Sequence, residues 1–465
     1  MLLSLLFLAF PFSPTGLEKS LLDQVGHRLR ADLERFDRAG YWGRGDSAIY
    51  AWTCGQHLAS MIELYKATRN REWLDRFASV VDKMFDALTP DEEGFLSWRT
   101  RLYTGAFVAV KPLPRNKSRA RLEPKEQWIY DLRVARSIER DRTLVLAFEG
   151  GRGNEWTVKV EDKTSGKRVA LLTVREGKRF LIPPGVPLTL RGRPSPGDGF
   201  SILIRRPKEF AYAVHDGVIL APVCRFVLLV RKDPKLASAH GRRAGRYLRV
   251  MEEHLVSKWD RYWRDLGKRG GVLVFPNDPS FRYPGITLPH NQYLALGRVL
   301  VLLWRITGKE GYRKRAEKMG RFFKSCLRKV DDCYLWHYWD PAGPWDEELA
   351  KVDRPRPEDT GHATLDIGFV LEAEEAGIVF TREDLRLFAN TFVKTMWNGS
   401  LEEPQIGGWV GSKRPSRQSA NLQEWVRLCK VEPLILEICK RIIPRSGSLL
   451  AKAQLLALLA RGGEN

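Results

Sequence analysis

Cysteine is scarce in this sequence, and none of it forms a CxxC pair. The 465 residues include six cysteines. They lie far apart along the chain, at Cys54, Cys224, Cys326, Cys333, Cys429 and Cys439. This spacing disfavours a structural zinc site of the CxxC type. Three of the six fall on apolar helical patterns, which indicates packed thiols, with a bridge between Cys326 and Cys333 as the alternative.

Motifs for binding nucleic acid are also missing. The chain carries no zinc-finger, RNA-recognition or basic-zipper signature, although its formal charge is +21. We therefore predict no nucleic-acid partner. A surplus of this size still attracts anions, such as anionic lipid or an acidic polysaccharide. The alternative is a charged surface that serves solubility, or stability at high temperature.

The N-terminus lacks both a basic segment and an apolar run long enough to cross a bilayer. Residues 1–16, MLLSLLFLAFPFSPTG, hold about ten apolar positions, and no Lys or Arg precedes Lys19. They resemble the apolar part of a secretion signal. We predict a secreted or cell-envelope protein with no stable membrane span. The alternative is a cytoplasmic protein whose N-terminal segment is buried in the fold.

Helical periodicity dominates what is present. Between Tyr293 and Ile306 almost every residue is apolar, which predicts an inner helix buried on most sides. Residues 310–329 carry a single apolar stripe, which predicts an outer helix. The pattern recurs, because LYKATRNREWLDRF and LWRITGKEGYRKRA share a Leu, aromatic, basic, x, Thr sequence followed by a further aromatic residue. We therefore predict repeated helical hairpins.

The period changes between residues 94 and 210. Short β-branched segments such as TLVLAFEG, EWTVKVED and FSILIRR alternate with turns rich in Gly, Pro and charge. They predict an antiparallel β-rich subdomain inserted between the first hairpins, residues 17–93, and the remainder of the helical domain, residues 211–465. Near Pro222 the pattern fits a helix or a strand. The predicted protein is mainly α, with about five or six hairpins in a closed or nearly closed ring.

Polar residues mark the loops that lead into the predicted inner helices. Aspartate or asparagine stands at each helix start: Asp46, Asp216, Asn291, Asp359 and Asn421. Both residue types are favoured N-caps, so capping is one explanation. Capping does not explain the neighbouring ionisable residues His215, His290, Glu358 and His362. In a ring of hairpins all these loops open on one face, which predicts a shared site there.

The residue types at these loops are suited to proton transfer and to binding sugars. Histidine and tyrosine can move protons, and Trp or Tyr rings stack on sugar rings. The predicted catalytic residues are His290, Asn291, His362, Tyr338, Glu358 and Asp359. The predicted substrate-binding residues are Asp46, Tyr50, Trp52, Asp216, Tyr293, Trp336, Trp339 and Trp409. No metal site and no cofactor is predicted, although a divalent metal between His290 and His362 is left open. The oligomeric state is also left open.

The hairpins LWRITGKEGYRKRA and LYKATRNREWLDRF, with LPHNQYLALGR and PEDTGHATLDIGF at two helix starts, resemble the α/α-toroid carbohydrate-active enzymes. That superfamily includes polysaccharide lyases and glycoside hydrolases. The resemblance implies an incomplete α/α toroid with its site in the central cavity. It also implies β-elimination on an acidic, uronic-acid-containing polysaccharide or oligosaccharide after abstraction of the C5 proton.

Under this resemblance His290 and Asn291 match the region that neutralises the uronate, and His362 and Tyr338 transfer protons. Three alternatives remain. A uronate epimerase shares the same proton abstraction. A glycoside hydrolase would pair carboxylates across the loops, for example Glu358 or Asp359 with Asp46 or Asp216. A non-catalytic glycan-binding protein would keep the ring without the chemistry.

Overall fold

A computed structural model describes residues 16–352 and 355–462. The chain divides into two compact units. Of the described residues, the helical unit comprises 16–98, 211–274, 287–352 and 355–462, and the strand-rich unit comprises Arg99–Phe210 and Phe275–Ile286. Helix makes up 51% and strand 20% of the structure, so the predicted mainly α class is confirmed. The predicted signal segment lies, up to residue 15, outside the described residues.

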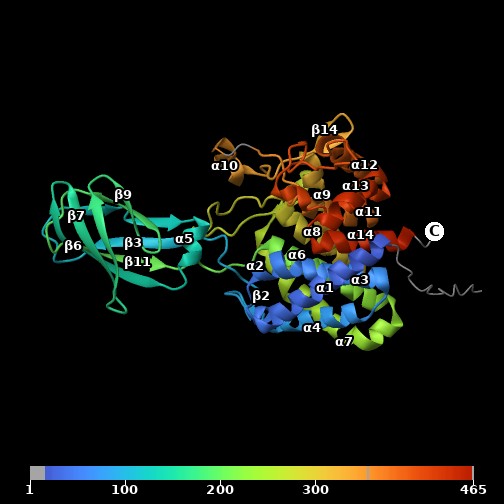
Figure 1. The fold of residues 1–465 in the computed structure, drawn as a ribbon, viewed down its shortest axis with the longest axis horizontal. Helices are drawn as coiled ribbons and strands as arrows, with labels where there is room; N and C mark the ends of the chain where they lie inside the picture. The colour runs from blue at the N-terminus through green and yellow to red at the C-terminus, as the bar shows by residue number, and fades with distance from the viewer. Residues whose placement is uncertain (1–15, 353–354, 463–465) are drawn as a thin grey trace, which may run out of the picture. The chain divides into compact units, whose positions relative to one another are not determined.

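The inner helices of the helical unit pack against one another in a row (Figure 1). Their order in space is α14 (Leu449–Gly462), α3 (Gly55–Thr68), α6 (Ala213–Lys232), α8 (His290–Thr307) and α11 (Ala363–Glu375). In α8 nearly every side chain between Tyr293 and Ile306 is buried, in keeping with its continuous apolar sequence. A Cβ on Gly217 of α6 would lie 2.3 Å from the backbone of Ala295 in α8, so glycine allows this close approach.

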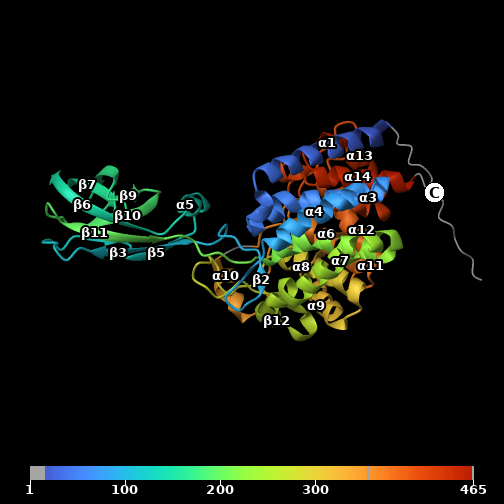
Figure 2. The ribbon, with the colours of Figure 1, turned by 90° about the horizontal axis from the view of Figure 1, so that it is seen from below.

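An outer helix packs on each inner helix (Figures 1 and 2). The outer helices are α1 (Gly16–Arg38) on α14, α4 (Glu72–Asp86) on α3, α7 (Pro234–Val250) on α6, α9 (Glu310–Cys326) on α8 and α12 (Arg382–Asn390) on α11. Each presents an apolar stripe: in α9 the buried residues include Ala316, Met319 and Phe323. These contacts define two layers of helices, but they do not establish that the layers close into a toroid.

The predicted inner helix beginning at Asn421 is wrong. This segment forms two 3-10 turns, η8 (Arg417–Ala420) and η9 (Trp425–Lys430), before α13 (Leu434–Ile442). Glu424 lies between the turns with a φ of 65°, which a right-handed helix cannot accommodate. The helix that packs beside α3 is α14, which comes later in the chain than the segment at Asn421. The ambiguous segment at Pro222 is helical and forms part of α6.

Short elements complete the helical unit. The helices are α2 (Ser47–Ile49) and α10 (Glu347–Val352). The strands pair as hairpins: β1 (Thr89–Pro90) with β2 (Leu96–Ser97), β12 (Trp263–Asp265) with β13 (Gly271–Leu273), and β14 (Arg328–Val330) with β15 (Cys333–Leu335). The last hairpin leads into the aromatic loop that forms part of the site described below.

The strand-rich unit contains two antiparallel sheets (Figure 1). Side chains from both sheets share one apolar core. The larger sheet has the order β5 (Glu126–Ile129), β3 (Ala106–Pro112), β11 (Gly199–Arg205), β6 (Arg142–Arg152), β7 (Glu155–Asp162) and β8 (Arg168–Arg175). The smaller has the order β4 (Arg121–Glu123), β10 (Val186–Arg191) and β9 (Arg179–Ile182), and a short helix α5 (Leu132–Ser137) follows β5. Buried and less buried residues alternate along β7, as a sheet with one face on a core requires.

The cysteines and the apolar helix α6 bear on two further predictions. All six cysteines are free thiols, so the alternative of a Cys326–Cys333 bridge is wrong. One described helix, α6, is long and apolar enough to cross a membrane, but 83% of that stretch is buried within the protein. Such burial is typical of a core helix, so no stable span is evident in the described part of the chain.

Candidate functional site

A histidine is held in a fixed orientation just before α11. The Asp359 Oδ1 accepts bonds from the backbone N–H groups of Gly361 and His362, both at 2.9 Å. The other oxygen, Oδ2, lies 2.5 Å from Nδ1 of His362. The Asp359 carboxylate thus both caps the turn and orients the imidazole of His362. When Nδ1–H donates to this carboxylate, Nε2 keeps its lone pair and can accept a proton.

Two buried carboxyl groups flank this histidine in the chain: Oε1 of Glu358 lies 4.0 Å from Nδ1 of His362, and Asp366 follows one turn later in α11. Both residues are fully buried. Oε1 of Glu358 accepts a bond from the Asp359 N–H at 3.0 Å, and Oδ2 of Asp366 accepts one from Nε1 of Trp336 at 2.9 Å. Burial, followed by the nearby carboxylates of Asp366 and Asp359, raises the pKa of Glu358 well above its usual value. Burial does the same to the pKa of Asp366.

The second oxygens of this pair are unsatisfied. Oε2 of Glu358 and Oδ1 of Asp366 have no hydrogen-bond partner among the residues that the structure describes. Unpaired buried oxygens favour the neutral form of a carboxyl group, because a charge there is costly. The surroundings therefore favour the neutral form of both carboxyl groups, and that of Glu358 lies near the imidazole of His362.

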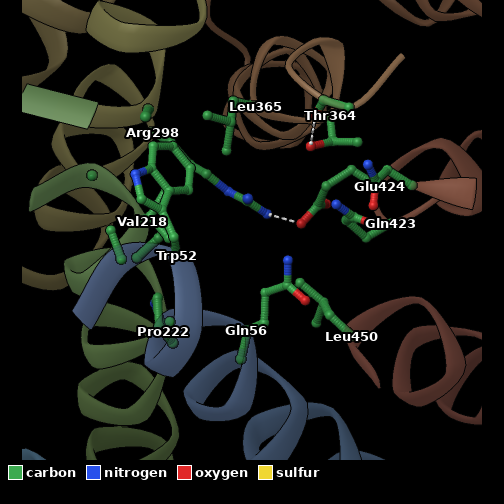
Figure 3. Close-up of a pocket in the computed structure, with 18 of the residues that line it drawn as sticks. Trp52, Gln56, Val218, Pro222, Arg298, Thr364, Leu365, Gln423, Glu424 and Leu450 are labelled. Atoms are coloured by element: carbon green, nitrogen blue, oxygen red, sulfur yellow. Dashed lines mark hydrogen bonds and ion pairs between the residues drawn. The ribbon is translucent and has the colours of Figure 1, made fainter. Parts of the chain in front are cut away.

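Two cavities meet at His362. The inner cavity measures about 260 Å³ and lies among the inner helices. Figure 3 shows side chains from several segments around it, among them Trp52, Gln56, Arg298 and Glu424. The outer cavity is an open depression of about 610 Å³, lined by Tyr338, Arg356, Pro357, Glu358, Asp359, His362, Trp409, Ser412 and Arg414. The His362 side chain is 40% exposed and lines both.

Backbone pairing positions the wall of the outer cavity. Asp359 forms an antiparallel bridge with Trp409, and the N–H of Val410 donates to the Glu358 carbonyl at 2.8 Å. The ring of Tyr338 lies 5.6 Å from the ring of His362, centroid to centroid. Aromatic faces and the imidazole are therefore close enough to contact one small molecule.

The inner cavity has a charged lining. Arg298 donates to Oε1 of Glu424 at 2.8 Å, the interaction drawn in Figure 3, and Arg427 donates to the other oxygen at 2.6 Å. Arg225, which also lines the cavity, donates to Glu372. Within residues 16–352 and 355–462, Nε of Arg298 has no partner. Burial lowers the pKa of Arg298, so an anion in the cavity would be stabilised by the guanidinium and would stabilise it in turn.

The structure brings part of the predicted site together. The predicted residues that line a cavity are Trp52, Tyr338, Glu358, Asp359, His362 and Trp409. Those that line neither cavity are Asp46, Tyr50, Asp216, His290, Asn291, Tyr293, Trp336 and Trp339. The catalytic and binding roles predicted for both groups stay predictions, while the contacts of the second group indicate structural roles.

Capping and burial account for several of the residues outside the cavities. Asp46 accepts bonds from the N–H groups of Ala48 and Ile49 and so caps α2. Asp216 lies inside α6, fully buried, with Lys258 Nζ at 2.8 Å. The hydroxyl of Tyr50 donates to a backbone carbonyl. These contacts hold the helix starts and the loops before them in place, and none of these three side chains lines either cavity.

The aromatic loop and the start of α8 are held in a similar way. Nε1 of Trp339 donates to the Thr287 carbonyl at 2.9 Å. His290 is nearly fully buried, with Nδ1 at 2.7 Å from the Tyr293 hydroxyl. Asn291, next to it, is also buried. Residues of the types that bind metals form two separate groups: His290 with Cys326 and Asp340, and His362 with Glu358 and Asp359. The structure therefore does not place one ion between the two histidines.

Sequence reasoning missed the charged residues on the inner helices. Arg298, Asp366 and Glu372 each lie in a helix whose other residues are mostly apolar. A charge on an otherwise apolar helix is costly unless it is paired, so this contrast was available as a signal. Glu424 had no such signal, because its unusual backbone conformation depends on the surrounding fold.

Comparisons with known proteins give little. No family model matches the chain, and no curated protein does. Among solved structures, the flagellar junction protein FlgL from Legionella pneumophila matches with 13% identity over 45% of this chain and 81% of that one, at a TM-score of 0.16. FlgL from Xanthomonas campestris matches with 11% identity over 43% and 79%, at a TM-score of 0.15. Similarity this low carries no argument about the fold or role of this chain.

No family model and no curated protein, carbohydrate-active or other, matches the chain, and this corrects the predicted family. The solved structures named above are flagellar junction proteins, and no role for this chain is taken from them. The predicted membership of the α/α-toroid carbohydrate-active enzymes is therefore wrong, and the predicted lyase, epimerase, hydrolase or glycan-binding function is withdrawn with it. The hairpin pattern that suggested the family reflects helix packing, which many helical proteins share.

Proposed function

We propose that the helical unit is an enzyme that transfers protons to and from a small organic anion bound beside His362. The observation that carries this proposal is the position of His362 where the two cavities meet, with Nδ1 held by Asp359. An imidazole oriented by a carboxylate can act as a general base through its other nitrogen. Glu358, whose pKa is raised by burial, supplies a neutral carboxyl group nearby.

Charge and shape favour an anionic substrate. Arg225 and Arg298 line the inner cavity against the single carboxylate of Glu424. Arg356 and Arg414 line the outer one. An anion in the inner cavity would meet more cationic than anionic side chains. In the outer cavity the two arginines lie with Asp359 and with Glu358, whose raised pKa favours its neutral form. The formal charge of +21 would assist the approach of an anion to both. Trp52, 40% exposed, offers an aromatic face to a planar group.

Two finer features belong to this proposal. The inner helices serve as the wall of an incomplete α/α toroid, an arrangement supported by the contacts that run from α14 through α3, α6 and α8 to α11. The protein acts in the cell envelope or outside the cell, as the apolar residues 1–16 suggest. A cytoplasmic location is the competing prediction.

The test begins with a thermal-shift screen of small carboxylates and phosphate esters. Compounds that stabilise the protein are then incubated with it in D₂O, and NMR follows C–H exchange and product formation. His362→Gln should slow exchange or turnover by about 10²–10⁴-fold while still binding the compound. Trp52→Ala should weaken binding. His27→Gln, at an exposed position of α1, is the matched control.

Two results would contradict the proposal. One is a screen in which no anion stabilises the wild-type protein. The other is an exchange or turnover rate in the His362→Gln variant equal to that of the control.

A further inference from the structure

A second group of metal-binding residue types lies at the start of α8, apart from both cavities. One ligand atom each from His290, Cys326 and Asp340 lie within 4.8 Å of one another. They come from three segments: the first residue of α8, the last of α9, and the loop after β15. Nε2 of His290 is 3.0 Å from Oδ2 of Asp340. The tertiary fold therefore gathers one nitrogen, one sulfur and one oxygen at one point.

We propose that His290, Cys326 and Asp340 bind a structural zinc ion. Zinc takes imidazole nitrogen, thiolate sulfur and carboxylate oxygen at roughly 2.0–2.3 Å, so tetrahedral ligand atoms lie roughly 3.3–3.8 Å apart. The separations here, 4.8 Å at most, require only a small approach of the side chains. The mixed donor set also favours zinc over Ca²⁺ or Mg²⁺, which prefer oxygen alone.

The surroundings match what a bound histidine needs. A metal-bound imidazole is held by a hydrogen bond at its second nitrogen. For His290 that nitrogen, Nδ1, lies 2.7 Å from the hydroxyl of Tyr293. The second oxygen of Asp340 lies 3.3 Å from Nδ1 of His337. His337 can thus orient the carboxylate from outside, or move inward as the fourth ligand.

A nucleophilic cysteine explains the group less well. Cys326 is the last residue of α9 and is only partly exposed. Neither Cys326 nor His290 lines the inner or the outer cavity, so a nucleophilic thiol here would face neither of them. Zinc would displace the thiol proton itself, and its binding should therefore weaken as the pH falls.

The position of the group gives the ion a structural role. Asp340 belongs to the aromatic loop that also carries Tyr338, whose ring lies 5.6 Å from that of His362. An ion held by His290 and Cys326 would fasten this loop to the ends of α8 and α9. It would thereby fix one wall of the outer cavity, and this assignment does not depend on the proposed reaction there.

Cobalt substitution tests the proposal directly, because a thiolate ligand gives Co²⁺ a charge-transfer band in the near ultraviolet. The full chain is stripped with a chelator and titrated with Co²⁺ and then with Zn²⁺. We expect one equivalent of Co²⁺ to produce the band and Zn²⁺ to abolish it. Cys326→Ser should remove the band, and Cys333→Ser, a buried cysteine seven residues away, should keep it.

A partly exposed ligand guards against variants that fail to fold. Asp340 is 21% exposed at its side chain, so Asp340→Asn should fold, as circular dichroism would show, and should bind Co²⁺ at least tenfold more weakly. The proposal is overturned if the wild-type chain shows no charge-transfer band. It is equally overturned if the band survives in the Cys326→Ser variant, since the thiolate ligand would then come from another cysteine. Co²⁺ bound by Glu358, Asp359 and His362 would give no such band, because that group contains no sulfur.

Discussion

Replacing Glu372 by glutamine should destabilise the helical unit more than any change at a surface ion pair. This carboxylate is 3% exposed and accepts a hydrogen bond from Arg225. Arg298 and Arg305 lie 3.5 Å from it, and Arg427 lies 3.7 Å away. The substitution keeps the shape of the side chain and removes its charge. Buried guanidinium groups would then lose their shared counter-ion.

The expected loss is about 3–5 kcal/mol of unfolding free energy, the usual cost of breaking a buried ion pair from one side. Glu375 provides the control, because it lies one turn further along and pairs with Arg305 at 3.2 Å, but is 49% exposed. Exposed pairs contribute about 0–1 kcal/mol. For a unit of this size each kcal/mol corresponds to roughly 2 °C, so Glu372→Gln should lower the melting temperature by about 6–10 °C.

The difference should also depend on pH. Burial alone would raise the pKa of Glu372, but the arginines, Arg225 first, hold it well below the usual value. A depressed pKa contributes stability that is present above the unfolded value, about 4.3, and is lost as the pH falls below it. Differential scanning calorimetry between pH 3 and 8 measures this directly. Equal melting temperatures for Glu372→Gln and Glu375→Gln at pH 7 would refute the reasoning.

Three further perturbations follow from single contacts. Asp366→Asn should leave the protein at least as stable as the wild type at pH 8. The pKa values of Asp366 and Glu358 are raised, so the stability that these carboxyl groups contribute in their neutral form is lost as the pH rises. A gain in stability that grows on acidification would contradict this. Gly217→Ala should cost about 1–3 kcal/mol or more in chemical denaturation, because its Cβ would meet backbone atoms of Ala295 that no rotamer change can move; a neutral effect would mean that α6 and α8 are further apart. Thr381→Ala should cost about 0.5–2 kcal/mol, because its hydroxyl caps the first turn of α12; unchanged stability would show that the turn is capped otherwise.

Local pattern was a good guide where one stretch of chain decides its own structure. The near-continuous apolar run at residues 293–306 became α8, and the single stripe at residues 310–329 became α9 and the start of β14. Alternating segments such as EWTVKVED became strands of the strand-rich unit. Local pattern failed at Asn421, where the polar start and the apolar run that follows resemble those of the other helices. Glu424 in this segment has a φ of 65°, which is incompatible with a continuous right-handed helix.

The composition of the site could not be obtained in this way. The sequence pattern puts an aspartate at the start of three predicted inner helices, but the folded protein uses each one differently. Asp46 caps a helix, Asp216 pairs with buried Lys258, and Asp359 orients His362. Arg298 belongs to the cavity although it stands two turns beyond the loop that was expected to carry function. Which side chains share a space depends on the packing of helices that are far apart in sequence.

The sequence by itself determined the two kinds of secondary structure, the order of the segments and the surplus of positive charge, because periodicity and composition act over a few neighbouring residues. Only the tertiary structure decided that His362 lies where two cavities meet, that Glu358 and Asp366 are buried together, and that Cys326 lies beside His290 and Asp340. The physical reason is that pKa shifts, ion pairing and metal binding depend on distances of a few ångströms between residues that the chain brings together only on folding.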